Sequence, residues 1–265
     1  MKICMMSSSF ADPAKEIEFA GKHDFQGFEL AFEYPEAIPE QIFRRSKQIL
    51  DAFSRYNLIR IGHTQSFVNI CDPSEAIRRA SIQETIKALE AAHRLDIGFL
   101  TVHPGFLWPV MKGDKALKKT CESLKALLKA ADDLNLILGV ENLPPRFFPP
   151  RGYFSRTEEF DVVFSEIASQ RLKLVLDVAH ANFPESDQPL NFIDKFYEKL
   201  AHVHLSDNLG QRDDHLPLGA GIVDYKTSIG ELKRRKYRGT VTLEIFSKDR
   251  DCLLMSKRKL EELLR

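Results

Sequence analysis

Short runs of β-branched and apolar residues alternate with longer segments of helical spacing along the whole chain. The short runs predict β-strands at residues 3–6, 27–32, 58–63, 97–103, 136–141, 172–177, 201–205 and 240–245. Residues 74–94 carry apolar side chains at steps of about three to four, which predicts an amphipathic helix. These side chains are Ala76, Ile77, Ala80, Ile82, Ile86 and Leu89. Asp72 and Pro73 predict its start, with the proline in the first turn.

Eight strands that alternate with eight helical segments predict the α/β class and a single (β/α)₈ TIM barrel. A length of 265 residues is ordinary for this fold. A doubly wound open sheet is the competing arrangement, but eight evenly spaced units favour a closed barrel. We find no linker or low-complexity segment, so we expect one domain over residues 1–265.

Composition limits the partners and the compartment. Lys plus Arg and Asp plus Glu number 38 each, so no net charge attracts the chain to nucleic acid or to a membrane. The four cysteines show no C-x-x-C spacing, which is typical of reduced thiols in a cytoplasmic protein. No segment has the apolar length of a signal peptide or of a membrane span. We therefore expect a cytoplasmic protein without a membrane partner.

Six successive predicted strands carry, within one residue of their carboxyl end, a side chain that can bind metal or transfer a proton. These residues are His63, His103, Glu141, Asp177, His204 and Glu244, and His180, Asp213 and His215 follow in the loops. In this fold the carboxyl ends of the strands meet at the face that carries the chemistry. One such residue alone is ordinarily structural, but six in succession predict a metal centre. His202 is expected to lie deeper, in the core or behind a ligand; Asp207 and Asn142 either orient ligands or cap turns.

Imidazole and carboxylate ligands without thiolates suit Zn²⁺, Mn²⁺, Co²⁺ or Fe²⁺, and among these we expect Zn²⁺ first. One ion uses about four to six ligands, so nine candidates permit two or three ions that share carboxylates.

Six stretches resemble the xylose isomerase-like TIM barrels, a superfamily that includes sugar-phosphate isomerases and epimerases and endonuclease IV (AP endonuclease family 2). They are TVHPG, GVENL, LVLDVAH, HVHLSDN, DDHLPLGAG and GTVTLEI, and the resemblance covers nearly the whole chain. It implies that the nine residues above, with His63 completing the set, correspond to the ligands of the three zinc ions of endonuclease IV. The single-metal epimerases of the superfamily use only the four positions that resemble Glu141, Asp177, His204 and Glu244.

The chain also departs from endonuclease IV. Residues 3–10 read ICMMSSSF where that family has a Gly-Ala-His-Val-Ser-like segment, and Ser66 stands where the family has a tyrosine that distorts DNA. The segment PPRFFPPRGYF, with Arg146 and Arg151, could form a basic and aromatic lip for DNA together with Arg156. We favour the other interpretation, a proline-stiffened lid over a small ligand.

The resemblance therefore implies a divalent-metal-dependent enzyme, and we expect a sugar or sugar-phosphate isomerase or epimerase with a small carbohydrate substrate. In this interpretation Glu141 and Glu244 are catalytic and exchange a proton through a metal-stabilised enediolate. His180, Trp108 and Arg146 are the expected substrate-binding residues. The alternative is an endonuclease IV-like zinc phosphodiesterase that acts on abasic DNA. A non-catalytic metal-binding barrel ranks third.

Overall fold

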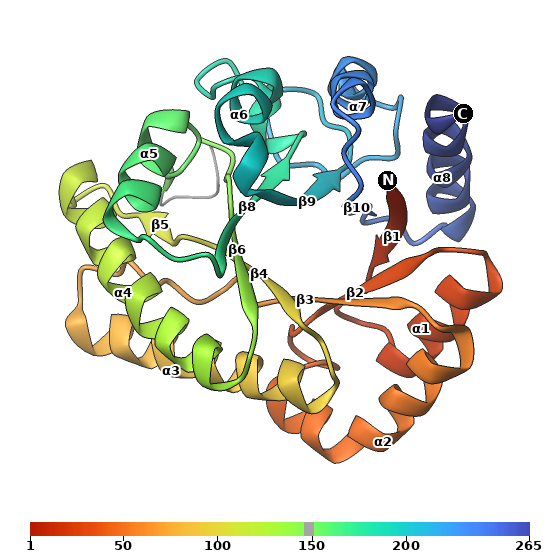
Figure 1. The fold of residues 1–265 in the computed structure, drawn as a ribbon, viewed down its shortest axis with the longest axis horizontal. Coiled ribbons are helices and arrows are strands. Elements are labelled where there is room, and N and C mark those ends of the chain that lie inside the picture. The colour runs from red at the N-terminus through yellow and green to blue at the C-terminus, as the bar shows by residue number, and fades with distance from the viewer. Residues whose placement is uncertain (146–150) are drawn as a thin grey trace.

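Eight parallel strands close into a barrel that is surrounded by helices (Figure 1). The computed structural model describes residues 1–145 and 151–265. The barrel strands are β1 (Lys2–Met6), β2 (Gly27–Ala31), β3 (Ile59–His63), β4 (Phe99–Val102), β6 (Ile137–Glu141), β8 (Leu172–Asp177), β9 (Leu200–Leu205) and β10 (Thr240–Leu243). Each pairs with its neighbour in chain order, and β1 pairs with β10 to close the ring. The predicted single (β/α)₈ barrel is confirmed.

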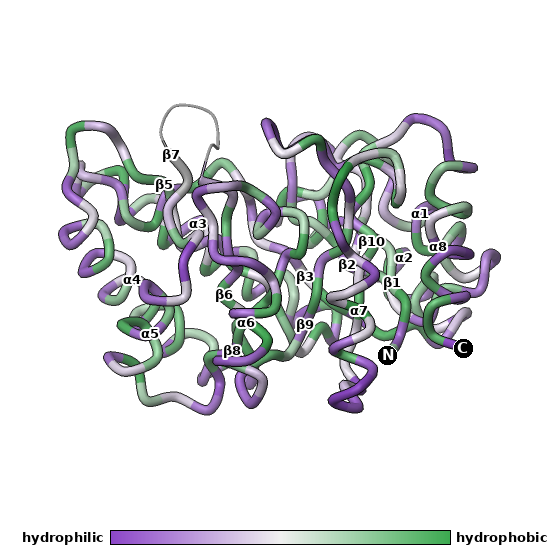
Figure 2. The backbone as a smooth tube through the Cα atoms, turned by 90° about the horizontal axis from the view of Figure 1, so that it is seen from above, coloured by the Kyte–Doolittle hydropathy of each residue, from purple (hydrophilic) through white to green (hydrophobic). Residues whose placement is uncertain are grey.

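One helix follows each barrel strand and covers its outer side. The helices are α1 (Pro13–Lys22), α2 (Pro39–Tyr56), α3 (Glu75–Arg94), α4 (Gly113–Asp133), α5 (Thr157–Glu166), α6 (Pro189–Phe196), α7 (Tyr225–Arg234) and α8 (Arg250–Leu264). Two short 3₁₀ helices cover His180–Asn182 and Tyr197–Lys199. The start of α1 illustrates local encoding, because Asp12 accepts hydrogen bonds from the amides of Ala14 and Lys15 and Pro13 opens the helix. Viewed from the side, many hydrophilic segments lie in the loops at the ends of the barrel (Figure 2).

Two predicted strands are shorter than expected by two or more residues. The strand predicted at 97–103 spans Phe99–Val102, and the one predicted at 240–245 spans Thr240–Leu243. His103 and Glu244 therefore directly follow their strands. The structure also adds a small antiparallel sheet of β5 (Phe106–Leu107) and β7 (Arg151–Gly152), which joins the loops after β4 and β6. Strands this short leave no periodic pattern in a sequence.

The start and the buried face of α3 differ from the prediction. Ser74 is the residue before the helix, and Asp72 accepts a hydrogen bond from its amide, so Pro73 precedes the helix instead of lying in its first turn. Ile77 is 54% exposed, whereas Ile82 and Leu89 are buried. Ile77 lies five residues before Ile82, which is about 140° around the helix at about 100° per residue. The expected apolar stripe was therefore wrong at its beginning.

The barrel interior changes from apolar to polar toward the carboxyl ends of the strands. A side chain at Gly139 would place its Cβ 2.4 Å from Val175 Cγ2 and 2.5 Å from Phe99 Cζ, so only glycine fits there. Polar residues also point inward, and Thr101 on β4 and His202 on β9 are both fully buried. Buried polar groups require partners, so the upper interior must form a connected network.

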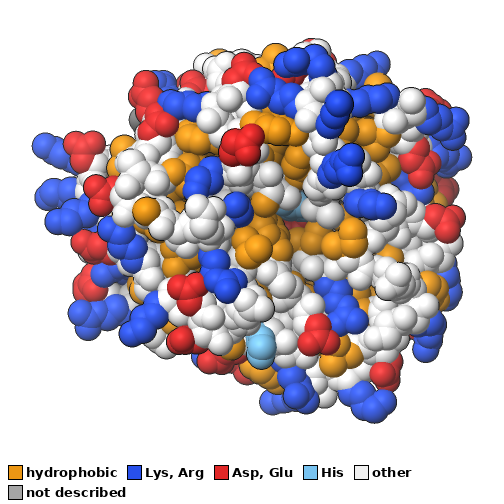
Figure 3. All heavy atoms as spheres, in the orientation of Figure 1, with side chains coloured by type: hydrophobic (Ala, Val, Ile, Leu, Met, Phe, Trp, Pro, Cys, Tyr) orange, Lys and Arg blue, Asp and Glu red, His pale blue; other side chains and the backbone are white. Residues whose placement is uncertain are grey.

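Charged side chains of both signs are mixed on the surface shown in Figure 3, around hydrophobic residues near the barrel axis. None of the helices in the described ranges combines the length and hydropathy that a membrane crossing requires.

Candidate metal centre

The structure brings all nine predicted ligands to the carboxyl end of the barrel, in three groups, two of which share Glu141. In each group the potential ligand atoms lie within 4.8 Å of one another. We call them the His63 group (His63, His103, Glu141), the His204 group (Glu141, Asp177, His204, Glu244) and the His180 group (His180, Asp213, His215). The predicted clustering is therefore found, while metal binding by these residues stays a prediction.

Glu141, the last residue of β6, connects the first two groups. Its Oε2 atom lies 3.4 Å from His63 Nε2 and 3.1 Å from His103 Nε2. Its Oε1 atom lies 2.8 Å from His204 Nδ1, and that nitrogen is also 3.1 Å from Glu244 Oε2. One carboxylate thus faces three imidazoles, and Glu141 would supply ligand oxygens to the His63 group and to the His204 group.

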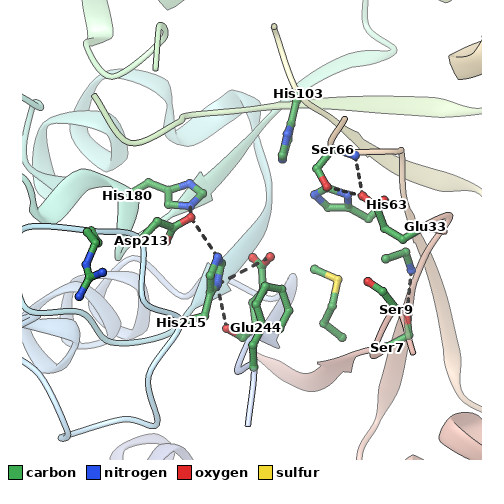
Figure 4. Close-up of a pocket in the computed structure, with 14 residues that line it drawn as sticks. Ser7, Ser9, Glu33, His63, Ser66, His103, His180, Asp213, His215 and Glu244 are labelled. Carbon is green, nitrogen blue, oxygen red and sulfur yellow. Dashed lines mark hydrogen bonds and ion pairs between the residues drawn. The ribbon is translucent and has the colours of Figure 1, made fainter. Parts of the chain in front are cut away.

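Asp213 joins the two histidines of the third group. Its Oδ2 atom lies 3.1 Å from His180 Nε2 and 3.0 Å from His215 Nε2 (Figure 4). His215 Nδ1 also lies 3.8 Å from Glu244 Oε1, which connects this group to the His204 group. Asp-x-His in the loop after β9 therefore turns both side chains toward one point.

Backbone carbonyls fix the tautomers of three histidines. The Nδ1 atom of His63 lies 2.7 Å from the Thr64 carbonyl oxygen, and that of His180 lies 2.8 Å from the Asn142 carbonyl oxygen. His215 Nδ1 lies 3.1 Å from the Glu244 carbonyl oxygen. A carbonyl only accepts, so each Nδ1 must donate, and in the neutral ring the lone pair lies on Nε2, toward the group. This second hydrogen bond is typical of histidines that bind metal.

Two buried carboxylate oxygens support the fit of a cation. Asp177 Oδ2 and Asp213 Oδ1 have no hydrogen-bond partner within the described ranges. Burial raises the pKa of Asp177 to about 6, so neighbouring protein charges do not fully compensate its negative charge. A buried carboxylate oxygen without a partner is costly, and a divalent cation would satisfy it. The donor set therefore fits a divalent metal.

In the metal-free protein, protons bound to the histidines compensate part of the negative charge of the buried carboxylates. Burial alone would lower the pKa of His63, but its hydrogen bond with Glu141 raises that pKa to about 9. Burial likewise opposes protonation of His215, but the charge of Asp213 raises its pKa to about 9. Burial would raise the pKa of Glu141, yet His204 and the other surrounding histidines hold it well below its ordinary value. Cation binding must therefore displace protons from these imidazoles.

Glu29 on β2 is a buried residue of this network that the sequence analysis missed. Its carboxylate lies 2.9 Å from His202 Nε2 and 3.1 Å from His204 Nε2, and it accepts a hydrogen bond of 3.0 Å from Thr101. It is fully buried. Because Glu29 binds Nε2 of His204, the Nδ1 atom of that ring faces Glu141 and Glu244. The available signal was a lone glutamate inside an otherwise apolar strand.

The supporting residues behave differently from one another. Asn142 accepts from the Asp177 amide and donates to the Asp177 carbonyl, so it holds the end of β8 in place. Asp207 caps the following loop by accepting from the amides of Gly219 and Val223. His202, expected in the core or behind a ligand, lies in the buried layer with Glu29.

A cavity of about 560 Å³ opens beside the metal centre (Figure 4). This volume suits a small-molecule ligand. His180 lines it, as expected of a substrate-binding residue. Its lining also includes residues that the sequence analysis did not select, namely Ser7, Ser9, Glu33, Ser66, Arg212 and Phe246. Trp108 is not among the lining residues and donates instead to Asp72. Arg146 lies outside the described residues.

The chain is similar in sequence to an uncharacterised protein, to a sugar epimerase and to a probable endonuclease. The chain is 27% identical to an uncharacterised protein of Methanocaldococcus jannaschii over 86% of this chain and 77% of that protein. It is 24% identical to fructoselysine 3-epimerase of Escherichia coli O157:H7, over 75% of this chain and 72% of the enzyme. It is also 24% identical to the "probable endonuclease 4" of Thermosipho melanesiensis, over 83% and 82% of the two chains.

The solved structure of a D-tagatose 3-epimerase-like protein superposes with a TM-score of 0.87 at 26% identity. The match covers 100% of this chain and 97% of that one. The family model described as "Xylose isomerase-like TIM barrel" matches residues 17–265. The chain therefore belongs to the xylose isomerase-like TIM barrel family.

Proposed function

We propose that this chain is a divalent-metal-dependent isomerase or epimerase of a small carbohydrate, with Zn²⁺ as the expected ion. The observation that carries the proposal is the pair Glu141 and Glu244, which approach the same His204 nitrogen from β6 and from the end of β10. Glu244 also lines the cavity, so a bound ligand would contact its carboxylate. The similarity to sugar epimerases supports the same reaction class.

The roles follow from the side chains. The His204 group would hold the cation, which supplies a Lewis acid that polarises a carbonyl and the adjacent hydroxyl. One of the two glutamates takes the proton from the carbon next to the carbonyl, and the other returns a proton to the opposite face of that carbon. The C–H bond that breaks is replaced by one of inverted configuration. His180, which lines the cavity, would orient a substrate hydroxyl.

The direct test is solvent exchange. The Zn²⁺-, Mn²⁺- or Co²⁺-loaded protein is incubated with ketoses in D₂O, and NMR follows deuterium at the carbon next to the carbonyl together with the epimeric product. We expect both for at least one ketose. Absence of exchange with every ketose, together with cleavage of abasic DNA, would replace this proposal by the phosphodiesterase.

The phosphodiesterase stays the second candidate because the His63 and His180 groups go beyond the four residues that one ion needs. We nevertheless expect weak, salt-sensitive binding of abasic DNA and no efficient incision by the zinc-loaded protein. Phosphate recognition needs several cationic side chains, and Arg212 is the one Lys or Arg among the described residues that line the cavity. Gel analysis of a labelled abasic duplex measures this. Efficient incision that Glu141→Gln abolishes would reverse the ranking.

Replacing Glu29 by glutamine should weaken metal binding by about 10- to 100-fold, the usual effect of losing a partner behind a metal-binding histidine. Glutamine keeps the size, but its amide group would face an imidazole N–H with another donor. Competition with a chromophoric chelator measures the affinity, and Glu40→Gln on the surface of α2 is the control. An unchanged affinity in a folded Glu29→Gln protein would mean that Glu29 does not orient His204.

A further inference from the structure

The cavity has a second polar wall, opposite the His180 group. Ser7, Ser9, Glu33 and Ser66 line it, and they come from the loops after β1, β2 and β3. Figure 4 shows these four residues across the cavity from His180, Asp213 and His215. None of the four belongs to the candidate ligand groups. We call them the hydroxyl wall.

Glu33 is held in place within the hydroxyl wall. Its Oε1 atom accepts from the Ser66 amide at 2.6 Å and also from the Ser66 hydroxyl. Both hydrogen bonds use the same oxygen, so Oε2 is left to accept from a ligand. A carboxylate fixed in this way loses less conformational entropy when it binds a hydroxyl group, because its position is already set.

Ser7 adds a donor beside that acceptor. Its Oγ atom accepts from the Ala31 amide at 2.9 Å, which fixes the oxygen and leaves the hydroxyl hydrogen free to donate. Ser7 is buried, so a ligand that displaced water here would need to replace its hydrogen bonds. A carboxylate acceptor and hydroxyl donors together match the alternating donors and acceptors of a polyol.

The charge of the hydroxyl wall excludes an anionic group beside it. Glu33 is its charged member, and the wall contains no Lys or Arg. Arg212, on the loop after β9, lines the cavity from the other side, and its side chain is 86% exposed. A phosphate next to Glu33 would meet a like charge, and the wall supplies no Lys or Arg side chain to compensate it.

We infer that the hydroxyl wall binds the hydroxyl groups of an unphosphorylated ketose, at the end of the sugar chain away from the reacting carbon. The inference rests on the proposed function and specifies its substrate class. Phe246 lines the cavity, and its ring centroid lies 4.3 Å from that of His215. It offers an apolar surface to the C–H groups of the sugar.

The experiment compares D-fructose, D-fructose 6-phosphate and erythrulose, a shorter ketose that ends at its fourth carbon. For the wild type we expect a higher kcat/KM with D-fructose than with its phosphate. Glu33→Ala should lower kcat/KM for D-fructose by roughly 10- to 100-fold, mainly through KM, because a hydrogen bond to a charged group is lost. The loss should be smaller for erythrulose, and the discrimination against the phosphate should shrink. Glu36→Ala on the same loop, which pairs with Arg45 outside the cavity, is the matched control.

Two outcomes would overturn the inference while the proposed function stands. One is a wild-type preference for the phosphorylated ketose, and the other is an equal loss for D-fructose and erythrulose in Glu33→Ala. If the wild type turns over no ketose, the proposed function fails, and calorimetry with the unreactive polyol sorbitol still tests the wall. Sorbitol binding that Glu33→Ala weakens supports the wall; no binding, or equal binding by both proteins, contradicts it.

Discussion

Replacing Glu244 by glutamine is expected to slow proton exchange by about 10²–10⁴-fold while the barrel stays folded. Glutamine keeps the shape of the side chain but cannot take up a proton. Glu244 is the more informative of the two glutamates, because it lines the cavity and contacts His204 and His215, whereas Glu141 also holds the His63 group. We expect Glu141→Gln to reduce exchange to a similar degree and to lose metal as well.

Exchange of deuterium from D₂O into a turned-over ketose measures the effect, and Glu166→Gln on the surface of α5 is the control. Metal content measured on the same samples separates the two roles of Glu244. A variant that keeps its metal and loses exchange has lost its base; one that loses both has lost a ligand. Full activity in either Glu244→Gln or Glu141→Gln would contradict the mechanism with two glutamates.

Metal loading should stabilise the protein strongly. At a free ion concentration of about 1,000 times Kd, binding adds about 4 kcal/mol to the free energy of unfolding. For a chain of this size that corresponds to an increase in Tm of about 10 °C. Differential scanning calorimetry with and without Zn²⁺ measures it, and elemental analysis gives the number of ions. A single ion per chain, with none gained on titration, would mean that the His63 and His180 groups bind no further metal.

A rise in pH should lower the stability of the metal-free protein and should increase its affinity for metal. The folded-state pKa of His63 is about 9, above the ordinary value of about 6.5, so its protonation stabilises the metal-free protein below pH 6.5. That contribution is lost as the pH rises through 9. Metal affinity should instead increase over the same range, because the ion no longer competes with protons. A metal affinity that stays constant between pH 6.5 and 9 would show that no imidazole proton is displaced.

The features that could be predicted from the sequence are those that follow a periodic pattern of residues. Alternation along a strand assigns His63 and His103 to the inner face. Because a barrel brings the ends of its strands together, residues that are far apart in the sequence lie close together in the structure, as expected. The same alternation places Glu29 on the inner face of its strand. A glutamate within a strand is ordinarily solvated, however, and only the closed barrel shows that this one is enclosed. Glu33 and Ser66 lie in loops without any period, and their mutual contact depends on how two loops turn. Trp108 shows the converse, since Asp72 holds its indole away from the cavity lining.

The buried layer around Glu29 also constrains the order in which the chain can fold. Glu29 and its partners His202 and His204 are separated by 173 and 175 residues, so the carboxylate has no partner on β9 until nearly the whole chain exists. In a growing chain, the amino-terminal strands can associate early only if Glu29 stays hydrated, because an enclosed charge without a partner is strongly destabilising. The amino-terminal part of the barrel must therefore remain open to water until β9 docks, and its closure and the desolvation of Glu29 become one late, cooperative event.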